Sequence, residues 1–173
     1  MSERTQRVMG FVGRSGSGKT TVLSDLIPVL TNRGFSVSTV KHSHHDFDMD
    51  KPGKDSYRHR EAGAKEVLLT SAKRWALLHE LRDEPEFDMN ELIGRMTPVD
   101  ILLIEGFKRH DYPKVEVHRP SLDKPVLAAH DSSVIAVATD EPDHETVTSL
   151  TVPVLNLGDV NGIADFIVGY LKL

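Results

Sequence analysis

The chain contains no cysteine, and this absence excludes several kinds of site. Without thiols among its 173 residues there is no disulfide framework, no thiolate metal ligand and no cysteine nucleophile. The first seven residues, MSERTQR, also lack the apolar stretch of a secretion signal. We therefore expect the protein to be located in the cytoplasm.

The sequence also lacks long hydrophobic runs and an excess of basic residues. No apolar run approaches the roughly 20 residues that cross a bilayer, and the net charge is −5. Aromatic residues make up only 6% of the chain. We expect neither a membrane nor a nucleic acid as partner. The length favours a single domain over residues 1–173.

One motif is a phosphate-binding loop in its expected context. The segment Gly13–Thr20, GRSGSGKT, matches GxxxxGK[ST] between an apolar run at 8–12 and an amphipathic stretch at 19–33. Backbone N–H groups and the helix N-terminus would bind a phosphate, Lys19 would add a positive charge as a catalytic group, and Thr20 would place its hydroxyl on Mg²⁺. The predicted phosphate-binding residues are Gly13, Ser15, Gly16, Ser17, Gly18, Lys19, Thr20 and Thr21.

Strand-like and helix-like segments alternate along the rest of the chain. The fold class predicted from this alternation is α/β, a P-loop NTPase three-layer fold with a mostly parallel central sheet plus an edge β-hairpin. Asp88 and Glu91 form a capping-box pattern before a helix. The expected strands are 8–12, 35–40, 66–70, 74–80, 100–106, 115–118, 134–139 and 152–157, and the expected helices are 19–33, 55–62, 88–96 and 160–171.

Glu105 ends the most apolar expected strand, and Asp100 lies at the strand's other end, away from the site. An acidic residue at this position beside a phosphate loop holds Mg²⁺ directly or through water, which makes Glu105 a catalytic and metal-binding candidate. The alternative is local pairing of Glu105 with Lys108 or Arg109.

The segment 41–55 contains three histidines, four aspartates and three lysines. We prefer its interpretation as a switch-like segment beside the γ-phosphate, in which Asp48 or Asp50 helps to hold Mg²⁺. An ordinary solvated loop is the second interpretation. A transition-metal site that includes His44 and His45 is the third.

The nucleobase is less clearly indicated. The Asn-Lys-x-Asp sequence that marks guanine in many GTPases is missing. Asp140 could accept the N1–H and the exocyclic amine of guanine together, and it could equally be a turn residue. There is no DxxG after the Glu105 strand and no evident glutamine to orient water, so hydrolysis should be slow.

Several segments together resemble the molybdopterin-guanine dinucleotide biosynthesis protein B (MobB) family. They are Gly13–Thr20, the block 41–56 (KHSHHDFDMDKPGKDS), Arg74–Leu77, Ile104–Lys108 and Val134–Asp140, in the family's order. The resemblance implies a homodimeric GTP-binding adapter with weak GTPase activity. It also implies the cofactors GTP and Mg²⁺, and as partners the molybdopterin guanylyltransferase and the molybdopterin cofactor. By position, Asp48, Asp50 and Lys51 would approach the triphosphate.

The dimer also has a physical argument, because an aromatic, apolar edge strand at 74–80 invites pairing with a second copy. Two alternative functions stay open at this point. One is a small-molecule kinase, and the other is a metal-delivery GTPase that uses the histidine-rich segment.

Overall fold

The computed structural model describes residues 6–43, 47, 49–106 and 110–173. The chain divides into two compact units, Met1–His42 with Thr97–Leu173, and Ser43–Met96. Each unit is described by itself below. A single domain over residues 1–173 stays a prediction.

The first unit contains a six-stranded sheet in the order β2-β5-β1-β6-β7-β8. Every pairing recorded between its described strands is parallel. This arrangement confirms the predicted α/β class with a mostly parallel central sheet. The strands are β1 (Arg7–Val12), β2 (Val37–Lys41), β5 (Ile101–Glu105), β6 (Lys114–His118), β7 (Val134–Thr139) and β8 (Val154–Asn156).

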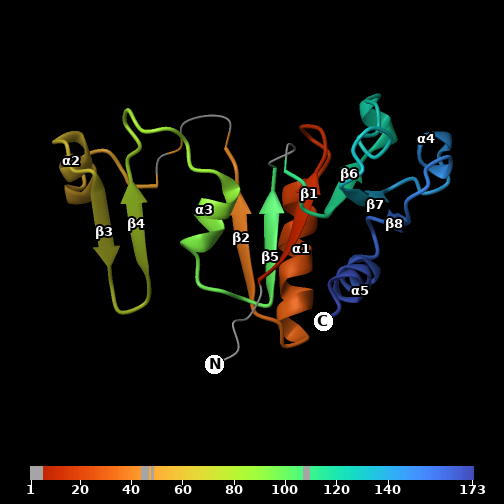
Figure 1. Ribbon diagram of the computed structural model, residues 1–173, viewed down its shortest axis with the longest axis horizontal. Coiled ribbons are helices and arrows are strands. Elements are labelled where there is room, and N and C mark those ends of the chain that lie inside the picture. The colour runs from red at the N-terminus through yellow and green to blue at the C-terminus, as the bar shows by residue number, and fades with distance from the viewer. Residues whose placement is uncertain (1–5, 44–46, 48, 107–109) are drawn as a thin grey trace. The chain divides into compact units, whose positions relative to one another are not determined.

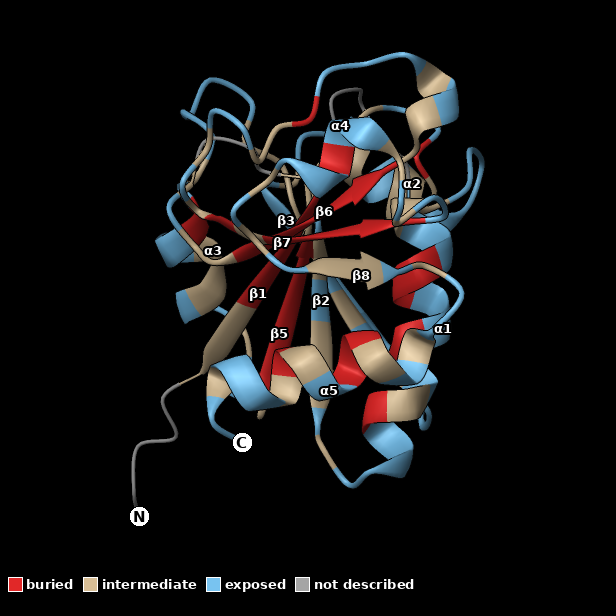
Figure 2. Ribbon diagram, turned by 90° about the vertical axis from the view of Figure 1, so that its right-hand side faces the viewer, coloured by how far each residue is buried: buried red, intermediate tan, exposed pale blue. Residues whose placement is uncertain are grey.

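Two amphipathic helices, α1 (Lys19–Asn32) and α5 (Val160–Leu171), pack together against the sheet. Alternate strand residues such as Met9 and Phe11 of β1 join Leu26 of α1 and Ile163 of α5 in the main core. The buried stripes of both helices face the buried central strands in Figure 2. Alternation along β5 therefore places Glu105 on the same side of the sheet as Ile101 and Leu103, facing α1.

The other face of the sheet is more polar. β6 turns Lys114, Glu116 and His118 away from the main core, and all three side chains are buried. A short helix, α4 (Glu145–Thr148), and a 3₁₀ turn, η1 (Pro120–Leu122), were not predicted. Four and three residues are too few to show a helical period in the sequence.

The parallel strands bring several segments to one edge of the sheet. The arrows of β2, β5 and β1 all point to the upper end in Figure 1. Because the strands are in parallel register, the residues that follow them share that edge. These residues include Gly13 after β1, His42 after β2, Gly106 after β5, Arg119 after β6 and Asp140 after β7.

The second unit contains α2 (Asp55–Glu61), the strands β3 (Glu66–Thr70) and β4 (Trp75–His79), and α3 (Met89–Gly94). β3 and β4 form an antiparallel two-stranded sheet, as expected for a hairpin. The predicted capping box at the start of α3 is present, since Asp88 and Glu91 each accept the other's backbone N–H at 2.8 Å. Within the described ranges, no helix is long and apolar enough to cross a bilayer.

Candidate functional site

The phosphate loop follows β1, and its backbone geometry requires glycine. Gly13 has φ = 149°, and a Cβ there would lie 2.3 Å from the Val117 carbonyl oxygen and 2.7 Å from Ser17 Oγ. Gly18, the N-cap of α1, is left-handed with φ = 95°. An L-residue could adopt neither position without strain or displacement. The predicted glycine roles at Gly13 and Gly18 thus have a steric basis here.

The N-terminus of α1 has the features of an anion-binding site. No side chain caps it, and its first turn contains no acidic residue. Uncapped N–H groups and the helix dipole therefore present positive charge where the loop joins the helix. Ser15, Gly16, Thr20 and Thr21 are exposed along this bend, whereas Ser17 is buried.

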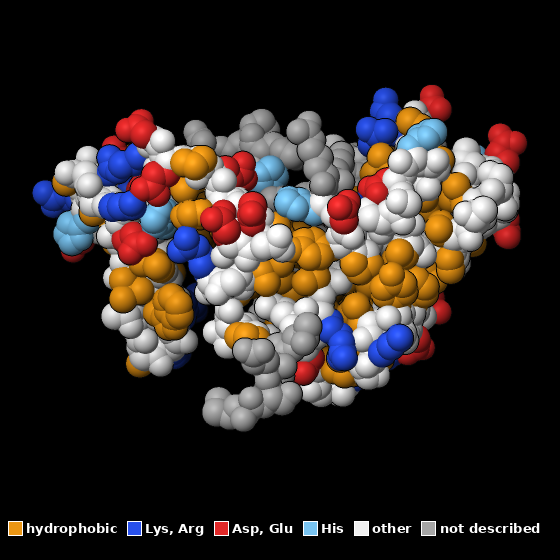
Figure 3. All heavy atoms as spheres, in the orientation of Figure 1, with side chains coloured by type: hydrophobic (Ala, Val, Ile, Leu, Met, Phe, Trp, Pro, Cys, Tyr) orange, Lys and Arg blue, Asp and Glu red, His pale blue; other side chains and the backbone are white. Residues whose placement is uncertain are grey.

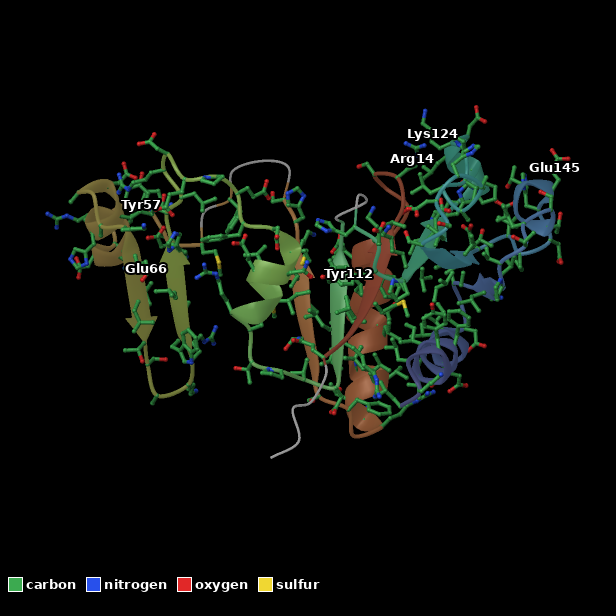
Figure 4. The ribbon with its side chains drawn as sticks, viewed as in Figure 1. Arg14, Tyr57, Glu66, Tyr112, Lys124 and Glu145 are labelled. Carbon is green, nitrogen blue, oxygen red and sulfur yellow. The ribbon has the colours of Figure 1, made fainter. Side chains whose placement is uncertain are left out.

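Lys19 spans the loop from its position in the first turn of α1. Its Nζ donates to the carbonyl oxygens of Gly13 at 3.2 Å and Arg14 at 3.0 Å. Both acceptors belong to the loop, so the ammonium lies over the bend that the sequence motif predicts for phosphate. Figure 4 shows the Arg14 side chain at the outer end of the same loop, beyond the end of β1.

Three polar side chains meet beside the loop. Thr20 Oγ1 donates to Glu105 Oε1 at 2.9 Å, and Lys41 Nζ lies 3.4 Å from Glu105 Oε2. Lys41 Nζ also lies 3.5 Å from Thr20 Oγ1. The prediction that Glu105 and Lys41 lie near the phosphate loop is thus confirmed. Lys108 and Arg109, the local alternative partners of Glu105, lie outside the described residues.

Strand register explains this cluster. Lys41 pairs with Glu105 across β2 and β5, and Thr20 lies in the first turn of α1, which covers the same face. The Glu105 side chain is 13% exposed, whereas that of Lys41 is 62% exposed. A mostly buried carboxylate beside a hydroxyl offers the hard oxygen ligands that Mg²⁺ prefers. The side chains of Thr20 and Glu105 therefore fit the predicted metal.

The opposite end of β5 is occupied differently. Asp100 Oδ2 accepts the backbone N–H of Ser36 at 2.8 Å and its hydroxyl at 2.6 Å. The prediction that Asp100 lies away from the site is confirmed, because parallel register places this residue at the amino ends of β2 and β5. Its bonds join these two strands instead.

Asp140, the candidate base-recognition residue, has a partner that the sequence did not reveal. Its carboxylate forms an ion pair with the Arg119 guanidinium. Arg119 Nε also donates to the Ser17 carbonyl oxygen in the phosphate loop, at 3.0 Å. The only sequence signal for Arg119 was its place directly after the expected strand 115–118.

The buried polar side of β6 fixes the chain beyond Arg119. Glu116 accepts the N–H groups of Leu127 and Ala128, both at 2.9 Å. Lys114 Nζ lies 3.2 Å from Asp131 Oδ2. Burial raises the pKa of Asp131, but hydrogen bonds from Ser133 and the charge of Lys114 outweigh it, so that the pKa is lowered. The segment 119–131 is therefore anchored at several points.

The remaining predicted site residues belong to the second unit or lie outside the described residues. The Asp50 carboxylate is 4% exposed and 3.2 Å from Arg60 Nη2, and Arg60 Nη1 is 3.6 Å from Glu80. This pairing competes with the predicted approach of Asp50 to a nucleotide, which stays a prediction, as does that of Lys51. Asp48, His44 and His45 lie outside the described residues. Among the side chains that the structure describes, no group of three or more histidines and carboxylates could hold a metal ion.

Comparison with known proteins shows which family the chain resembles over most of its length. The family described as "Molybdopterin guanine dinucleotide synthesis protein B" matches residues 8–140. The chain is 43% identical over 168 residues to the molybdopterin-guanine dinucleotide biosynthesis adapter protein of Escherichia coli, covering 95% of this chain and 93% of that protein. It is 41% identical over 164 residues to the protein of the same name from Haemophilus influenzae, covering 95% and 89%.

A solved structure named molybdopterin-guanine biosynthesis protein B superposes with a TM-score of 0.73 at 26% identity, covering 96% of this chain and 99% of that one. The family match spans most of the chain and includes the phosphate loop, Glu105 and Asp140. The chain belongs to the molybdopterin guanine dinucleotide synthesis protein B (MobB) family.

Proposed function

We propose that this protein is a GTP-binding adapter in molybdopterin guanine dinucleotide biosynthesis, with Mg²⁺ as cofactor and at most a weak GTPase activity. The observation that carries the proposal is the meeting of Lys19, Thr20, Glu105 and Lys41 around the uncapped start of α1. The names of the relatives support the adapter role.

Each group at this site has a distinct part in binding. The amides of the loop and the first turn of α1 would bind phosphate oxygens, and Lys19 would supply a unit charge. Thr20 and Glu105 would hold the metal, directly or through water. When bound, Mg²⁺ neutralises charge on the phosphate oxygens. The Lys41 side chain is mostly exposed, so its ammonium can move from Glu105 towards an added anion.

Weak hydrolysis follows from the composition around the site. Gln6 is the only glutamine in the sequence, and it precedes β1, at the edge opposite the phosphate loop. A water-orienting glutamine is therefore missing from the chain's own loops. Fast turnover would need a group supplied by another protein.

The partner assignments also belong to this proposal. The relatives named as adapters imply an enzyme of the same pathway as partner, and the molybdopterin guanylyltransferase is the enzyme we propose. Lys51, Lys54 and Arg58 are exposed and could meet the phosphates of a pterin dinucleotide. Arg60 is less suited to that role, because Asp50 and Glu80 already balance its charge.

A homodimer formed through the hairpin completes the proposal. Leu68, Trp75 and Leu77 lie on one face of the β3-β4 sheet, as the register Leu68↔Leu77 and Thr70↔Trp75 shows. Trp75 is 70% exposed, Leu68 62% and Leu77 48%. Hydrophobic side chains gather over this hairpin in Figure 3. An apolar face on a two-stranded sheet with open edges favours pairing with a second copy.

The test of nucleotide function is phosphate release from GTP with Mg²⁺ and no acceptor, together with calorimetric binding of GTP. We expect measurable binding and slow release. Strong stimulation of phosphate transfer by a small acceptor would instead favour a kinase. Nanomolar binding of nickel or zinc that is lost on replacing His44 and His45 would favour metal delivery. Absence of GTP binding would overturn the proposal.

A further inference from the structure

Arg119 connects two parts of the candidate site that lie far apart in sequence. It follows β6, the strand that pairs with β1 on one side and with β7 on the other. Gly13 follows β1 and Asp140 follows β7. The parallel register thus places Arg119 between the phosphate loop and Asp140.

The guanidinium uses different nitrogens for these two neighbours. Nε donates to the Ser17 carbonyl at 3.0 Å, and Nη1 forms the ion pair with Asp140 Oδ2. Nη2 lies 3.4 Å from the point that a Cβ on Gly18 would occupy. Arg119 therefore packs directly against Gly18, the N-cap of α1. A planar fork with fixed donor directions suits such a bridge better than the single ammonium of lysine.

The chain around Arg119 is held in place. Glu116, three residues earlier, is 1% exposed and accepts the N–H groups of Leu127 and Ala128. The Arg119 side chain is 37% exposed and that of Asp140 is 35% exposed. Both side chains are thus partly accessible at the edge where the phosphate loop lies.

The pairing leaves Asp140 able to accept further hydrogen bonds. An ionised carboxylate has about four acceptor positions, and Arg119 uses one oxygen. The ion pair fixes the orientation of the remaining positions relative to the loop. Guanine presents N1–H and an exocyclic amine to such an acceptor, whereas the N1 of adenine is itself an acceptor.

We propose that Arg119 is a positioning residue that sets nucleobase selectivity by holding Asp140 in register with the phosphate loop. This inference rests on the proposed nucleotide-binding function. Arg119 acts through Asp140 and makes no contact with the base itself. Its loss should therefore change the preference between nucleotides more than the affinity for their shared triphosphate.

The test is calorimetric titration of the full chain with Mg·GTP and Mg·ATP, for wild type, Arg119→Met, Asp140→Asn and the double variant. We expect wild type to prefer GTP and Arg119→Met to lower the GTP:ATP affinity ratio by about tenfold, the size of one lost base-reading pair. Because both residues act on one contact, the double variant should show the same ratio as Asp140→Asn alone. Arg33→Met is the matched control, since Arg33 forms an exposed ion pair with Asp165 elsewhere in the same unit.

Several results would overturn the inference. An equal loss of affinity for both nucleotides in Arg119→Met would show a merely structural role, and an unchanged ratio would show no role. A wild type that binds GTP and ATP equally would also refute it, while nucleotide binding would stand. If wild type binds neither nucleotide, the proposed function itself fails. Should Arg119→Met not fold, Arg119→Lys is measured in its place, with a smaller fall in the ratio expected because one ammonium cannot reach both partners.

Discussion

Replacing Glu105 by glutamine separates a metal-binding role from a structural one. The substitution keeps an oxygen acceptor for the Thr20 hydroxyl, which now donates to Glu105 Oε1 at 2.9 Å. It removes the charge that faces Lys41 at 3.4 Å. Because Lys41 is 62% exposed, that ion pair contributes no more than about 1 kcal/mol to the free energy of unfolding. We therefore expect nearly unchanged thermal unfolding.

The effect on metal binding should be larger. A carboxylate that reaches a divalent cation through one water, at about 4–5 Å, attracts it by about 2 kcal/mol in a water-like dielectric. This corresponds to roughly a 30-fold loss of Mg²⁺ affinity in the nucleotide complex. The assay is calorimetric GTP binding over a series of free Mg²⁺ concentrations, which gives the Mg²⁺ midpoint for each variant.

Asp100→Asn is the matched control, at the other end of the same strand. Asp100 bonds Ser36 and joins β2 to β5, so its loss should lower thermal stability and leave the Mg²⁺ midpoint unchanged. An unchanged Mg²⁺ midpoint in Glu105→Gln would refute the metal-binding role of Glu105. A midpoint that shifts equally in Asp100→Asn would show that strand stability, and not the carboxylate, controls metal binding.

Three further changes test other parts of the structure. Gly13→Ala places a Cβ 2.3 Å from the Val117 carbonyl oxygen and should lower the free energy of unfolding, measured by chemical denaturation, by about 2–4 kcal/mol. Gly16→Ala has open space around the new Cβ and should lower it by only about 1 kcal/mol. Equal losses in the two variants would contradict the steric argument. Leu77→Lys adds a charge to the exposed hairpin face and should convert a dimer to monomer in light scattering at micromolar concentration, while monomeric wild type would refute the dimer. Asp131→Asn should remove part of the acid sensitivity of unfolding. Because the pKa of Asp131 is lower in the folded state than its ordinary value of 3.8, the ionised carboxylate stabilises the fold above that value, and this stabilisation is lost as the pH falls through the folded pKa. The unfolding free energies of wild type and variant should therefore converge at low pH, whereas a constant difference from pH 7 to pH 2 would contradict the assignment.

Much of the first unit could be predicted from local sequence patterns. The phosphate loop depends on backbone turns that glycines impose within eight residues, so the motif itself indicates the geometry of Gly13 and Gly18. The apolar run before Glu105 indicated a buried strand, and parallel register then placed Glu105 beside Lys41. These predictions needed only the period of the side chains and the direction of the strands.

Other features depended on contacts that no local pattern contains. The ion pair of Arg119 with Asp140 joins the ends of two strands. The hydrogen bond from Arg119 to the Ser17 carbonyl connects residues that are 102 positions apart in the sequence. The burial of Asp50 against Arg60 was likewise hidden, because both residues lie in stretches that appear solvated. Charged residues in such stretches look alike in sequence until packing selects their partners.

We propose that the loop from Gly13 to Thr20 binds the triphosphate of GTP. The most direct test is calorimetric titration of Mg·GTP and Mg·ATP into wild type and Lys19→Ala. Removing the ammonium costs about 4 kcal/mol of attraction to a phosphate at roughly 4 Å with an effective dielectric constant near 20, close to a thousandfold in affinity. Its two bonds to loop carbonyls are worth only about 1–3 kcal/mol to folding, so the variant should stay folded. We predict tight GTP binding by wild type and none detectable in the folded variant; undiminished GTP affinity in Lys19→Ala would contradict the claim.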